Sequence, residues 1–347
     1  MKVLFNCNNS AFQAPGGGEI LLLKTREYLL KQKIKVKLFN QWEDKLTDHN
    51  ILHNFGLSSN CYDLINTAYN KKVPVAITPI YSWPSMKFAF RSGLNLKNKL
   101  NLSLYAFLHN YKPINELTYA NKMLKKANLI LTDSKAEKDV LMKTFKLDKN
   151  KFKVAPYGVD KRFYNSNKKE FINKYDLEDF LLYTGRIEPR KNVLTLIKIA
   201  NKFNLPLVII GSGDYQSGNE YYNLCKKAAK KNIVFINKIE HESSLLSSAY
   251  AAAKAVVLPS WLENPGLSVL EGGLAGSNVL VTSRGSTTEY FSNYAFYVNP
   301  FDNKDIGKKL LMVYKKEKDN KLREHIKKNF IWEVATSRVA KYYKDLL

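Results

Sequence analysis

The chain has 347 residues, of which 45% are hydrophobic and 25% are charged. These proportions are ordinary for a folded protein and exclude wholesale disorder, and the length predicts two domains of usual size. The formal net charge is +24. Such a surplus favours polyanionic partners, namely nucleic acid, an anionic membrane face or phosphorylated substrates, although the many Lys residues beside Asn and Ile also fit plain compositional bias.

Three features indicate where the protein works. No window reaches the roughly 18 uninterrupted apolar residues of a membrane-spanning helix. The opening segment turns polar after Phe5, unlike a signal peptide. The cysteines, Cys7, Cys61 and Cys225, are odd in number and far apart, which fits a reducing compartment. We therefore expect a cytoplasmic protein, with peripheral attachment to the cytosolic membrane face as a further hypothesis.

The first half of the chain alternates strand and helix patterns. A strand is expected over 2–7, followed by a glycine-rich loop and a helix from Glu19 to about Gln32. Further strands are expected at 35–39, 51–53, 73–78, 129–132 and 153–155. This alternation predicts a parallel sheet with both faces covered.

A second series of the same kind begins near Phe180. Strands are expected at 180–185, 207–211, 232–236, 255–260 and 278–283, with helices at 192–203, 220–230, 242–254 and 268–275. The segment 161–178 is interpreted as the polar junction between the series. We predict an α/β protein with two doubly wound, Rossmann-like domains over 1–165 and 166–328, and a C-terminal helix (329–347) that packs back on the first.

The glycine-rich turn before the first helix is a weak signal by itself. Backbone amides at 16–18 could approach a phosphate, but the turn is not a dinucleotide-binding G-x-G-x-x-G, because Ile20 and Leu21 follow Glu19. Likewise, the segment 213–220 is not a P-loop, since Asn219 stands where Lys is required.

Two cations follow the first strand of the second series. Arg186 leaves the carboxyl end of that strand, where ligands of open α/β sheets bind, and Lys191 precedes the next helix. One bidentate and one point-like cation can hold a diphosphate. Alone, the pair would equally fit two solvated bases in a basic protein.

A longer motif after the strand expected at 255–260 favours a binding site over two solvated bases. It places Glu263 in a strand-to-helix loop and Glu271 inside the following helix. Carboxylates so placed suit sugar or ribose hydroxyls, and the free amides of a helix start can accept polar groups. A generic helix cap explains Glu263 but not the whole string.

These segments together resemble a known family. The pattern GR-x4-K at 185–191, followed by PS-x2-E-x2-G-L-x2-L-E-x3-A-G at 259–276, is similar to the retaining glycosyltransferases of the GT-B fold, family 4. The strings at 16–19, 155–160 and 330–335 also match that family. The resemblance implies two Rossmann-like domains facing a central cleft.

The resemblance also implies roles for individual residues. Arg186 and Lys191 would bind the donor diphosphate and neutralise the leaving group, Glu271 would bind the ribose, and Glu263 would hold the donor sugar. The remaining donor-binding residues implied are Gly16, Gly17, Gly211, Lys238 and Ile239 near the base, and Asn264, Pro265, Gly266 and Leu267 beside the sugar.

This chain departs from the family in one place that matters for catalysis. Family members often carry a His after the strand expected at 73–78, whereas this chain has Pro79-Ile80-Tyr81-Ser82-Trp83. His109 is the nearest candidate, and a lone His is more often a packing or surface residue. No catalytic His is therefore assigned.

The expected reaction transfers a sugar from a nucleotide-diphosphate sugar to a glycan or lipid-linked acceptor, in surface polysaccharide or glycoconjugate synthesis. No D-x-D triplet occurs, so no metal and no other cofactor is expected. Two alternatives stay open: a sugar-nucleotide epimerase or phosphorylase of similar architecture, and a basic nucleic-acid-binding protein. The latter lacks zinc-ligand spacing and an aromatic RNA-binding signature, so no nucleic-acid partner is expected.

The segment Tyr81–Lys99 mixes aromatic and basic residues. Lys87, Arg91, Lys97 and Lys99 lie among Tyr81, Trp83, Phe88 and Phe90. Such stretches commonly lie on anionic membranes, which predicts reversible membrane association. The alternative is a solvated segment whose aromatic residues belong to the core.

Overall fold

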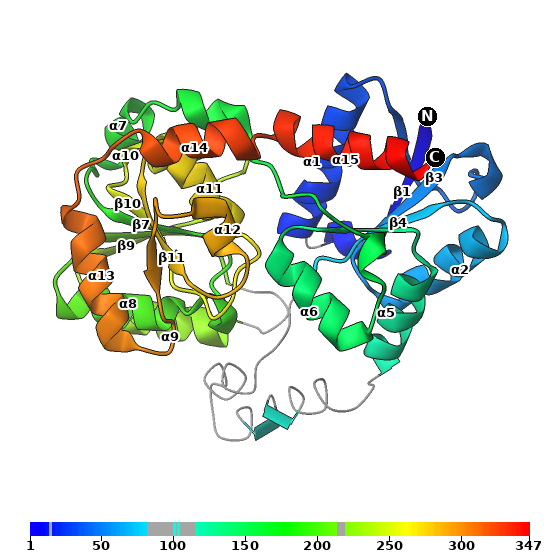
Figure 1. Cartoon of the computed structure of the whole chain (residues 1–347). Helices are drawn as coiled ribbons and strands as arrows, with labels where there is room; N and C mark the ends of the chain where they lie inside the picture. Colours follow the sequence, from blue (N-terminus) through cyan, green and yellow to red (C-terminus); the bar gives the residue numbers. More distant parts are fainter. Residues whose placement is uncertain (14–15, 82–99, 102, 105–114, 214–218) are drawn as a thin grey trace. The chain divides into compact units, whose positions relative to one another are not determined.

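The computed structural model describes residues 1–13, 16–81, 100–101, 103–104, 115–213 and 219–347 (Figure 1). They form two compact units. The first is built from the described residues of Met1–Pro84, Leu104–Gly158 and Phe330–Leu347, and the second from those of Ser85–Ser103 and Val159–Asn329. The division between the units falls at Gly158 and Val159, seven residues before the predicted boundary at 165/166.

The first unit contains a parallel sheet of six strands. Their spatial order is β2 (Lys35–Leu38), β1 (Lys2–Cys7), β3 (Ile51–Phe55), β4 (Val75–Thr78), β5 (Leu129–Thr132) and β6 (Phe152–Val154). Strand β5 has the predicted bounds. Strand β4 begins two residues later than predicted, because Pro74 has no N–H to donate to the ladder and contributes only its carbonyl, which accepts from Leu52 at 2.9 Å.

The helices of the first unit are α1 (Gly17–Lys31), α2 (Tyr62–Asn70), α5 (Asn115–Lys126), α6 (Lys135–Phe145) and α15 (Trp332–Leu346). Helix α15 packs along α1, where the side chain of Gln32 donates to the hydroxyl of Thr336 at 2.8 Å. Gly158 makes room for this helix, since a Cβ at that position would lie 2.5 Å from the ring of Trp332. The last segment of the chain is therefore part of the first unit.

The second unit contains another parallel sheet of six strands. Their order is β12 (Phe296–Val298), β11 (Asn278–Thr282), β10 (Ala255–Leu258), β7 (Leu181–Thr184), β8 (Leu207–Ile210) and β9 (Ile233–Ile236). From β7 the chain runs outward to β9, then returns to β10 beside β7 and runs outward to β12. The strand order thus reverses between β7 and β10, where open α/β sheets bind ligands at their carboxyl ends.

Helices cover both faces of the second sheet (Figure 1). One face carries α8 (Val193–Lys202), α9 (Glu220–Ala228) and α13 (Asn303–Lys315), and the other carries α7 (Lys169–Tyr175), α10 (Ser244–Ala252) and α11 (Leu267–Leu274). Helix α14 (Lys321–Phe330) packs outside α11, and α12 (Thr287–Phe291) follows β11. The prediction of two Rossmann-like α/β domains is confirmed.

The segment 161–178 is folded, so its interpretation as a polar junction was wrong. It contains a short 3₁₀ helix (Lys161–Asn165) and α7. Phe163 and Phe171 are fully buried, and the backbone N–H of Phe171 donates to the hydroxyl of Ser248 on α10 at 2.9 Å. These two apolar side chains and this hydrogen bond hold the segment within the second unit.

Of the predicted membrane-binding segment, Tyr81–Lys99, the structure describes Tyr81. Residues 82–99 lie outside the described residues, and so does His109. Tyr81 is buried, its ring packs edge-on against Phe145 with centroids 5.7 Å apart, and its N–H donates to the Glu137 carboxylate at 2.8 Å. Tyr81 is therefore a core residue, as the alternative interpretation expected, and membrane association through the segment Tyr81–Lys99 stays a prediction.

Among the described residues, no helix is both long enough and apolar enough to span a bilayer.

Candidate active site

Two loops diverge where the strand order of the second sheet reverses. One follows β7 and the other follows β10, and three hydrogen bonds join them. Asn192 donates to the carbonyl of Pro259 at 3.1 Å, and the indole and backbone N–H groups of Trp261 donate to the carbonyls of Pro189 and Arg190, each at 3.0 Å. The two strings that the sequence singled out thus form one cross-linked structure.

Lys191 and Glu263 meet between these loops. Lys191 Nζ lies 2.7 Å from Glu263 Oε1, with side chains 16% and 5% exposed. Burial raises the pKa of Glu263, but the charges of Lys191 and Arg190 outweigh burial and hold this pKa below its usual value. Burial and neighbouring Arg190 lower the pKa of Lys191. The carboxylate is therefore ionised, and a buried cation lies beside it.

Arg190 and Glu188 complete this charged cluster, and the sequence analysis missed both. Arg190 Nη2 lies 3.1 Å from Glu188, while its Nη1 donates to the carbonyl of Leu262 at 3.2 Å and lies 3.6 Å from Glu263. Its position directly before Lys191 was the available signal. These contacts give Arg190 a structural task, namely bracing the loop that carries Glu263.

Arg186 is placed differently from Lys191. Its side chain is 49% exposed, with Nε 3.8 Å from Glu188, and its backbone carbonyl accepts a hydrogen bond from buried Tyr183 at 2.6 Å. The backbone of Arg186 is thus fixed at the end of β7 while its guanidinium reaches solvent. A cation with this freedom can turn toward an incoming anion.

At two glycines the backbone of one loop lies so close to the backbone of another that there is no space for a Cβ. A Cβ at Gly211, at the end of β8, would lie 2.0 Å from the carbonyl oxygen of Gly185. A Cβ at Gly285 would lie 2.0 Å from the carbonyl oxygen of Glu263, whose N–H donates to the carbonyl of Arg284 at 3.2 Å. The sequence analysis missed Gly285, which fixes the backbone of Glu263 from the loop after β11.

The predicted sugar-binding turn leads from Glu263 into α11. The Asn264–Pro265 peptide bond is cis, Gly266 is the N-cap residue with a φ of +86°, and Leu267 is the first residue of the helix. The turn therefore places the backbone of these residues beside the Lys191–Glu263 pair, at the carboxyl end of β10.

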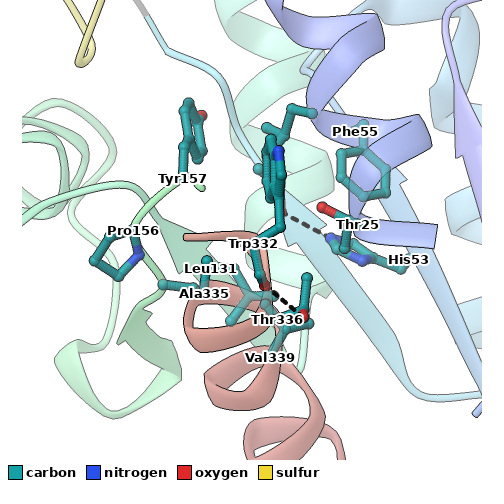
Figure 2. Close-up of a pocket in the computed structure, with 13 residues that line it drawn as sticks. Thr25, His53, Phe55, Leu131, Pro156, Tyr157, Trp332, Ala335, Thr336 and Val339 are labelled. Atoms are coloured by element: carbon teal, nitrogen blue, oxygen red, sulfur yellow. Dashed lines mark hydrogen bonds between the residues drawn. The ribbon is translucent and has the colours of Figure 1, made fainter. Parts of the chain in front are cut away.

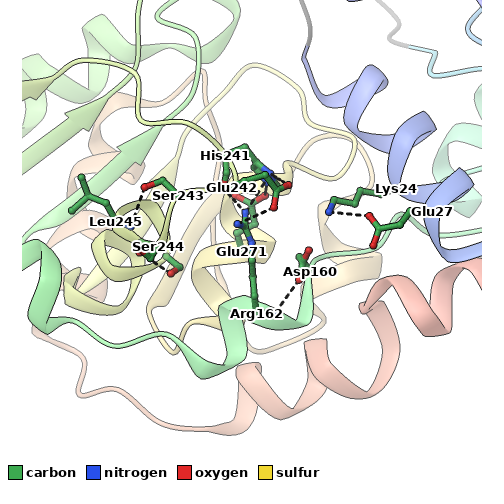
Figure 3. Close-up of polar contacts among 11 residues, drawn as sticks. Lys24, Glu27, Asp160, Arg162, His241, Glu242, Ser243, Ser244, Leu245 and Glu271 are labelled. Atoms are coloured by element: carbon green, nitrogen blue, oxygen red, sulfur yellow. Dashed lines mark hydrogen bonds and ion pairs between the residues drawn. The ribbon is translucent and has the colours of Figure 1, made fainter. Parts of the chain in front are cut away.

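Glu271 lies in a second polar cluster, which Figure 3 shows with its neighbours. Its Oε1 lies 2.8 Å from His241 Nε2, and its Oε2 accepts from the Tyr250 hydroxyl at 2.8 Å. Tyr250 in turn lies 2.8 Å from the hydroxyl of Thr184, the last residue of β7. The sequence analysis missed His241, although it lies in the loop that was assigned to the nucleotide base.

The other predicted donor-binding residues lie at loop positions. Lys238 is 61% exposed and pairs with Glu240 at 3.1 Å, and Ile239 is half-buried beside it. Gly16 and Gly17 belong to the first unit, where Gly16 caps α1 and its N–H donates to Glu19 at 2.7 Å. Gly16, Gly17 and Gly18 thus form the start of α1, the helix that follows β1.

His53 is one of the residues that line a small cavity in the first unit (Figure 2). Its volume of about 20 Å³ suits roughly one water molecule, and its lining includes Thr25, Tyr157 and Trp332. His53 Nδ1 lies 2.5 Å from the hydroxyl of Tyr343 on α15, and Nε2 lies 2.8 Å from Thr78. Burial lowers the pKa of His53 to about 3. This neutral imidazole ties α15 to the sheet, and the cavity is too small for a sugar.

Comparisons with solved structures identify the fold. Sucrose-phosphate synthase from Thermosynechococcus elongatus superposes with a TM-score of 0.76 at 15% identity, covering 100% of this chain and 99% of that one. Anabaena HepE, solved in complex with UDP and glucose, superposes with a TM-score of 0.74 at 14% identity, covering 99% and 100%. With two Rossmann-like units, the protein has the GT-B fold of glycosyltransferases.

Residues 165–331 match the family described as glycosyl transferases group 1. The O-antigen chain mannosyltransferase RfbU of Salmonella typhimurium is 30% identical over 186 residues, which are 52% of this chain and 49% of that protein. The O-antigen chain mannosyltransferase B of Escherichia coli is 24% identical over 259 residues, 68% and 66% of the two chains. The chain spans about half of the first relative's length and about two thirds of the second's.

Proposed function

We propose that this protein is a retaining glycosyltransferase of family 4 that transfers a sugar from a nucleotide-diphosphate sugar to a glycan or lipid-linked acceptor in surface polysaccharide synthesis. The observation that carries the proposal is the buried Lys191–Glu263 pair at the carboxyl edge of the second sheet, with Nζ and Oε1 2.7 Å apart. In the donor, the sugar is bonded directly to the diphosphate. The carboxylate that binds the sugar and the cation that binds the diphosphate must therefore be neighbours.

Electrostatics is the proposed source of catalysis. Negative charge grows on the diphosphate as the bond to the sugar breaks, and preorganised positive groups lower the barrier to that step. Lys191 is held in place by Glu263, whereas Arg186 is 49% exposed and free to turn toward the leaving group. We propose that these two cations take the role that a metal ion plays in other glycosyltransferases, so that no cofactor is needed.

Recognition of the nucleotide is assigned to the second polar cluster. Glu271 would accept hydrogen bonds from the ribose, and Lys238 and Ile239 would lie near the base. Glu263, with the backbone of the turn at 264–267, would hold the sugar hydroxyls. Gly16, Gly17 and Gly211 are further donor-binding residues in this proposal.

The relatives support this substrate class. Curated relatives are named as mannosyltransferases of O-antigen chains, and the Anabaena protein was solved with UDP and glucose. An epimerase or phosphorylase would use the same donor site without a glycan or lipid-linked acceptor, so acceptor dependence separates these functions from the proposed one.

The decisive experiment incubates the purified protein with a panel of nucleotide sugars and a mixture of lipid-linked acceptors, followed by mass spectrometry. We expect transfer of one sugar with retention of the anomeric configuration, read by NMR of the product. Glu263→Gln should lower turnover of the intact donor, whereas Glu271→Gln should weaken binding of the free nucleoside diphosphate in calorimetry. Equal loss of diphosphate binding in both variants would contradict this division, and no transfer with any donor would contradict the function.

A further inference from the structure

Both carboxylate oxygens of Glu271 already have a hydrogen-bond partner. His241 and Tyr250 each contact one of its two oxygens at 2.8 Å, and the residue is 6% exposed. A ribose that is to hydrogen-bond to this carboxylate must therefore share or displace one of these partners. Tyr250 is fully buried, whereas the His241 side chain is 26% exposed, so His241 is the partner on the solvent side.

The ring of His241 has a different environment at each nitrogen. Nε2 faces the Glu271 carboxylate at 2.8 Å. Nδ1 faces an acceptor, Glu242 Oε1 at 3.2 Å, and a donor, Arg162 Nη2 at 3.3 Å. A protonated ring can donate to both carboxylates, and a neutral ring can donate to Glu271 while accepting from Arg162. The same ring position therefore fits both protonation states.

The surroundings of His241 favour its proton. Two carboxylates and one guanidinium face the ring, and Phe163 packs edge-on against it with centroids 5.9 Å apart. Burial lowers the pKa of His241, but the hydrogen bond and charge of Glu271, with the hydrogen bond of Glu242, raise it above its ordinary value of 6.5. Arg162 works against this rise and also holds the loop, through its ion pair with Glu242 at 3.1 Å and its hydrogen bond to the carbonyl of His241.

We propose that His241 is a proton-controlled positioning residue for the donor nucleotide: its imidazolium holds Glu271 by charge and hydrogen bond, and loss of its proton leaves the hydrogen bond alone, so that the ribose shares or takes the carboxylate more easily. The inference rests on the proposed function, because Glu271 is assigned to the ribose there. The imidazolium attracts the carboxylate by its charge as well as by its hydrogen bond, whereas the neutral ring keeps the hydrogen bond alone. Affinity for the donor should therefore rise about tenfold as His241 loses its proton.

Calorimetry with UDP-glucose and GDP-mannose, from about pH 5.5 to about pH 8.5, tests this dependence. The phosphates of these diesters do not titrate in that range, so a change in affinity reports the protein. We expect the wild type to bind the accepted donor more tightly at high pH. His241→Gln keeps a donor for Glu271 but has no proton to lose, so its affinity should be independent of pH and close to the wild-type value at high pH.

A matched control removes a histidine elsewhere. His49 lies in the first unit and contacts the carbonyl of Lys45 at 3.1 Å, so His49→Gln should keep the wild-type pH dependence. If His241→Gln fails to fold, the wild type alone still decides: calorimetry near pH 6.5 in two buffers of different ionisation enthalpy should show protons released on donor binding.

The outcomes separate this inference from the proposed function. Affinity that is flat or falls with rising pH, binding without proton release, or a His241→Gln variant with the wild-type dependence each overturns the role of His241 while leaving the transferase standing. If no donor binds at any pH, both the proposed function and this inference are overturned.

Discussion

Lys191 and Glu263 stand 72 residues apart in the chain, yet their side chains form an ion pair of 2.7 Å. Each comes from a loop that follows one of the two adjacent strands β7 and β10, between which the strand order reverses. Because both side chains are largely buried, neither charge is well screened by solvent, and each depends on the other. The proposed chemistry and the stability of these loops are therefore coupled.

This coupling predicts two effects of removing Lys191. Lys191→Ala leaves the Glu263 carboxylate buried, with the Arg190 guanidinium 3.6 Å away as its remaining ion pair among the described residues. We expect the free energy of unfolding to fall by about 3 kcal/mol and turnover to fall by about 100-fold. The double variant Lys191→Met/Glu263→Gln should regain stability in urea unfolding without regaining turnover. Wild-type stability of Lys191→Ala would show that the pair is not buried in solution.

The two arginines of the same loop should behave differently. Arg186 is half exposed, so Arg186→Ala should lower turnover by about 100-fold with an unchanged melting temperature. Arg190 contacts Glu188 and the carbonyl of Leu262, so Arg190→Ala should lower the free energy of unfolding by about 2 kcal/mol. Thermal unfolding beside turnover distinguishes the variants, and full activity of Arg186→Ala would remove it from the diphosphate site.

Local sequence patterns predicted much of the fold. The strands Val75–Thr78, Leu129–Thr132 and Leu181–Thr184 are short runs buried along their whole length, which is the pattern of parallel sheets covered on both faces. Helix α7 was missed because Phe171, its fully buried anchor, is surrounded by polar residues. Periodicity is weak where a short helix buries one large side chain.

The site was predictable only in part. The strings at 185–191 and 259–276 located both loops. The contact of His241 with Glu271, however, joins residues 30 positions apart on different elements, and the approach of Gly285 to Glu263 joins two loops. Such pairings depend on how strands order themselves in the sheet, and no local pattern contains that information.

Gly285 and Gly276 offer a matched pair of substitutions. Both have positive φ, +99° and +95°, so Ala is strained at each, but a Cβ at Gly285 meets the Glu263 carbonyl at 2.0 Å whereas one at Gly276 meets nothing within 4 Å. Gly276→Ala should cost about 1 kcal/mol from strain alone. Gly285→Ala should cost more and should also lower turnover, because the backbone of Glu263 must move. Equal stability and equal turnover of the two variants would contradict this account.

Chelation tests the proposed use of side-chain cations. If Arg186 and Lys191 neutralise the leaving group, turnover after dialysis against EDTA should equal that of the untreated protein, and added Mg²⁺ or Mn²⁺ should not raise it. Turnover that is lost on chelation and restored by a divalent ion would assign part of that role to a metal.

His53 predicts how stability depends on pH. Burial holds its pKa at about 3 in the folded state, against an ordinary value of 6.5. Between these values the unfolded chain binds a proton that the folded protein does not, so stability is fully present above about pH 6.5 and falls as the pH is lowered toward 3. The expected loss is about 1.4 kcal/mol per pH unit from this residue.

The test compares slopes rather than absolute stabilities, because other groups also titrate in acid. His53→Asn removes the partner of Tyr343 and Thr78, so it should be less stable than the wild type at neutral pH. Its free energy of unfolding in urea should nevertheless fall less steeply between about pH 6 and about pH 4, because the variant has no buried imidazole to protonate. His49→Asn, at a half-buried position in the loop before β3, should fall in parallel with the wild type. If His53→Asn and the wild type lose stability at the same rate, the imidazole takes up its proton within the folded protein, and its contacts with α15 and β4 do not require the neutral form.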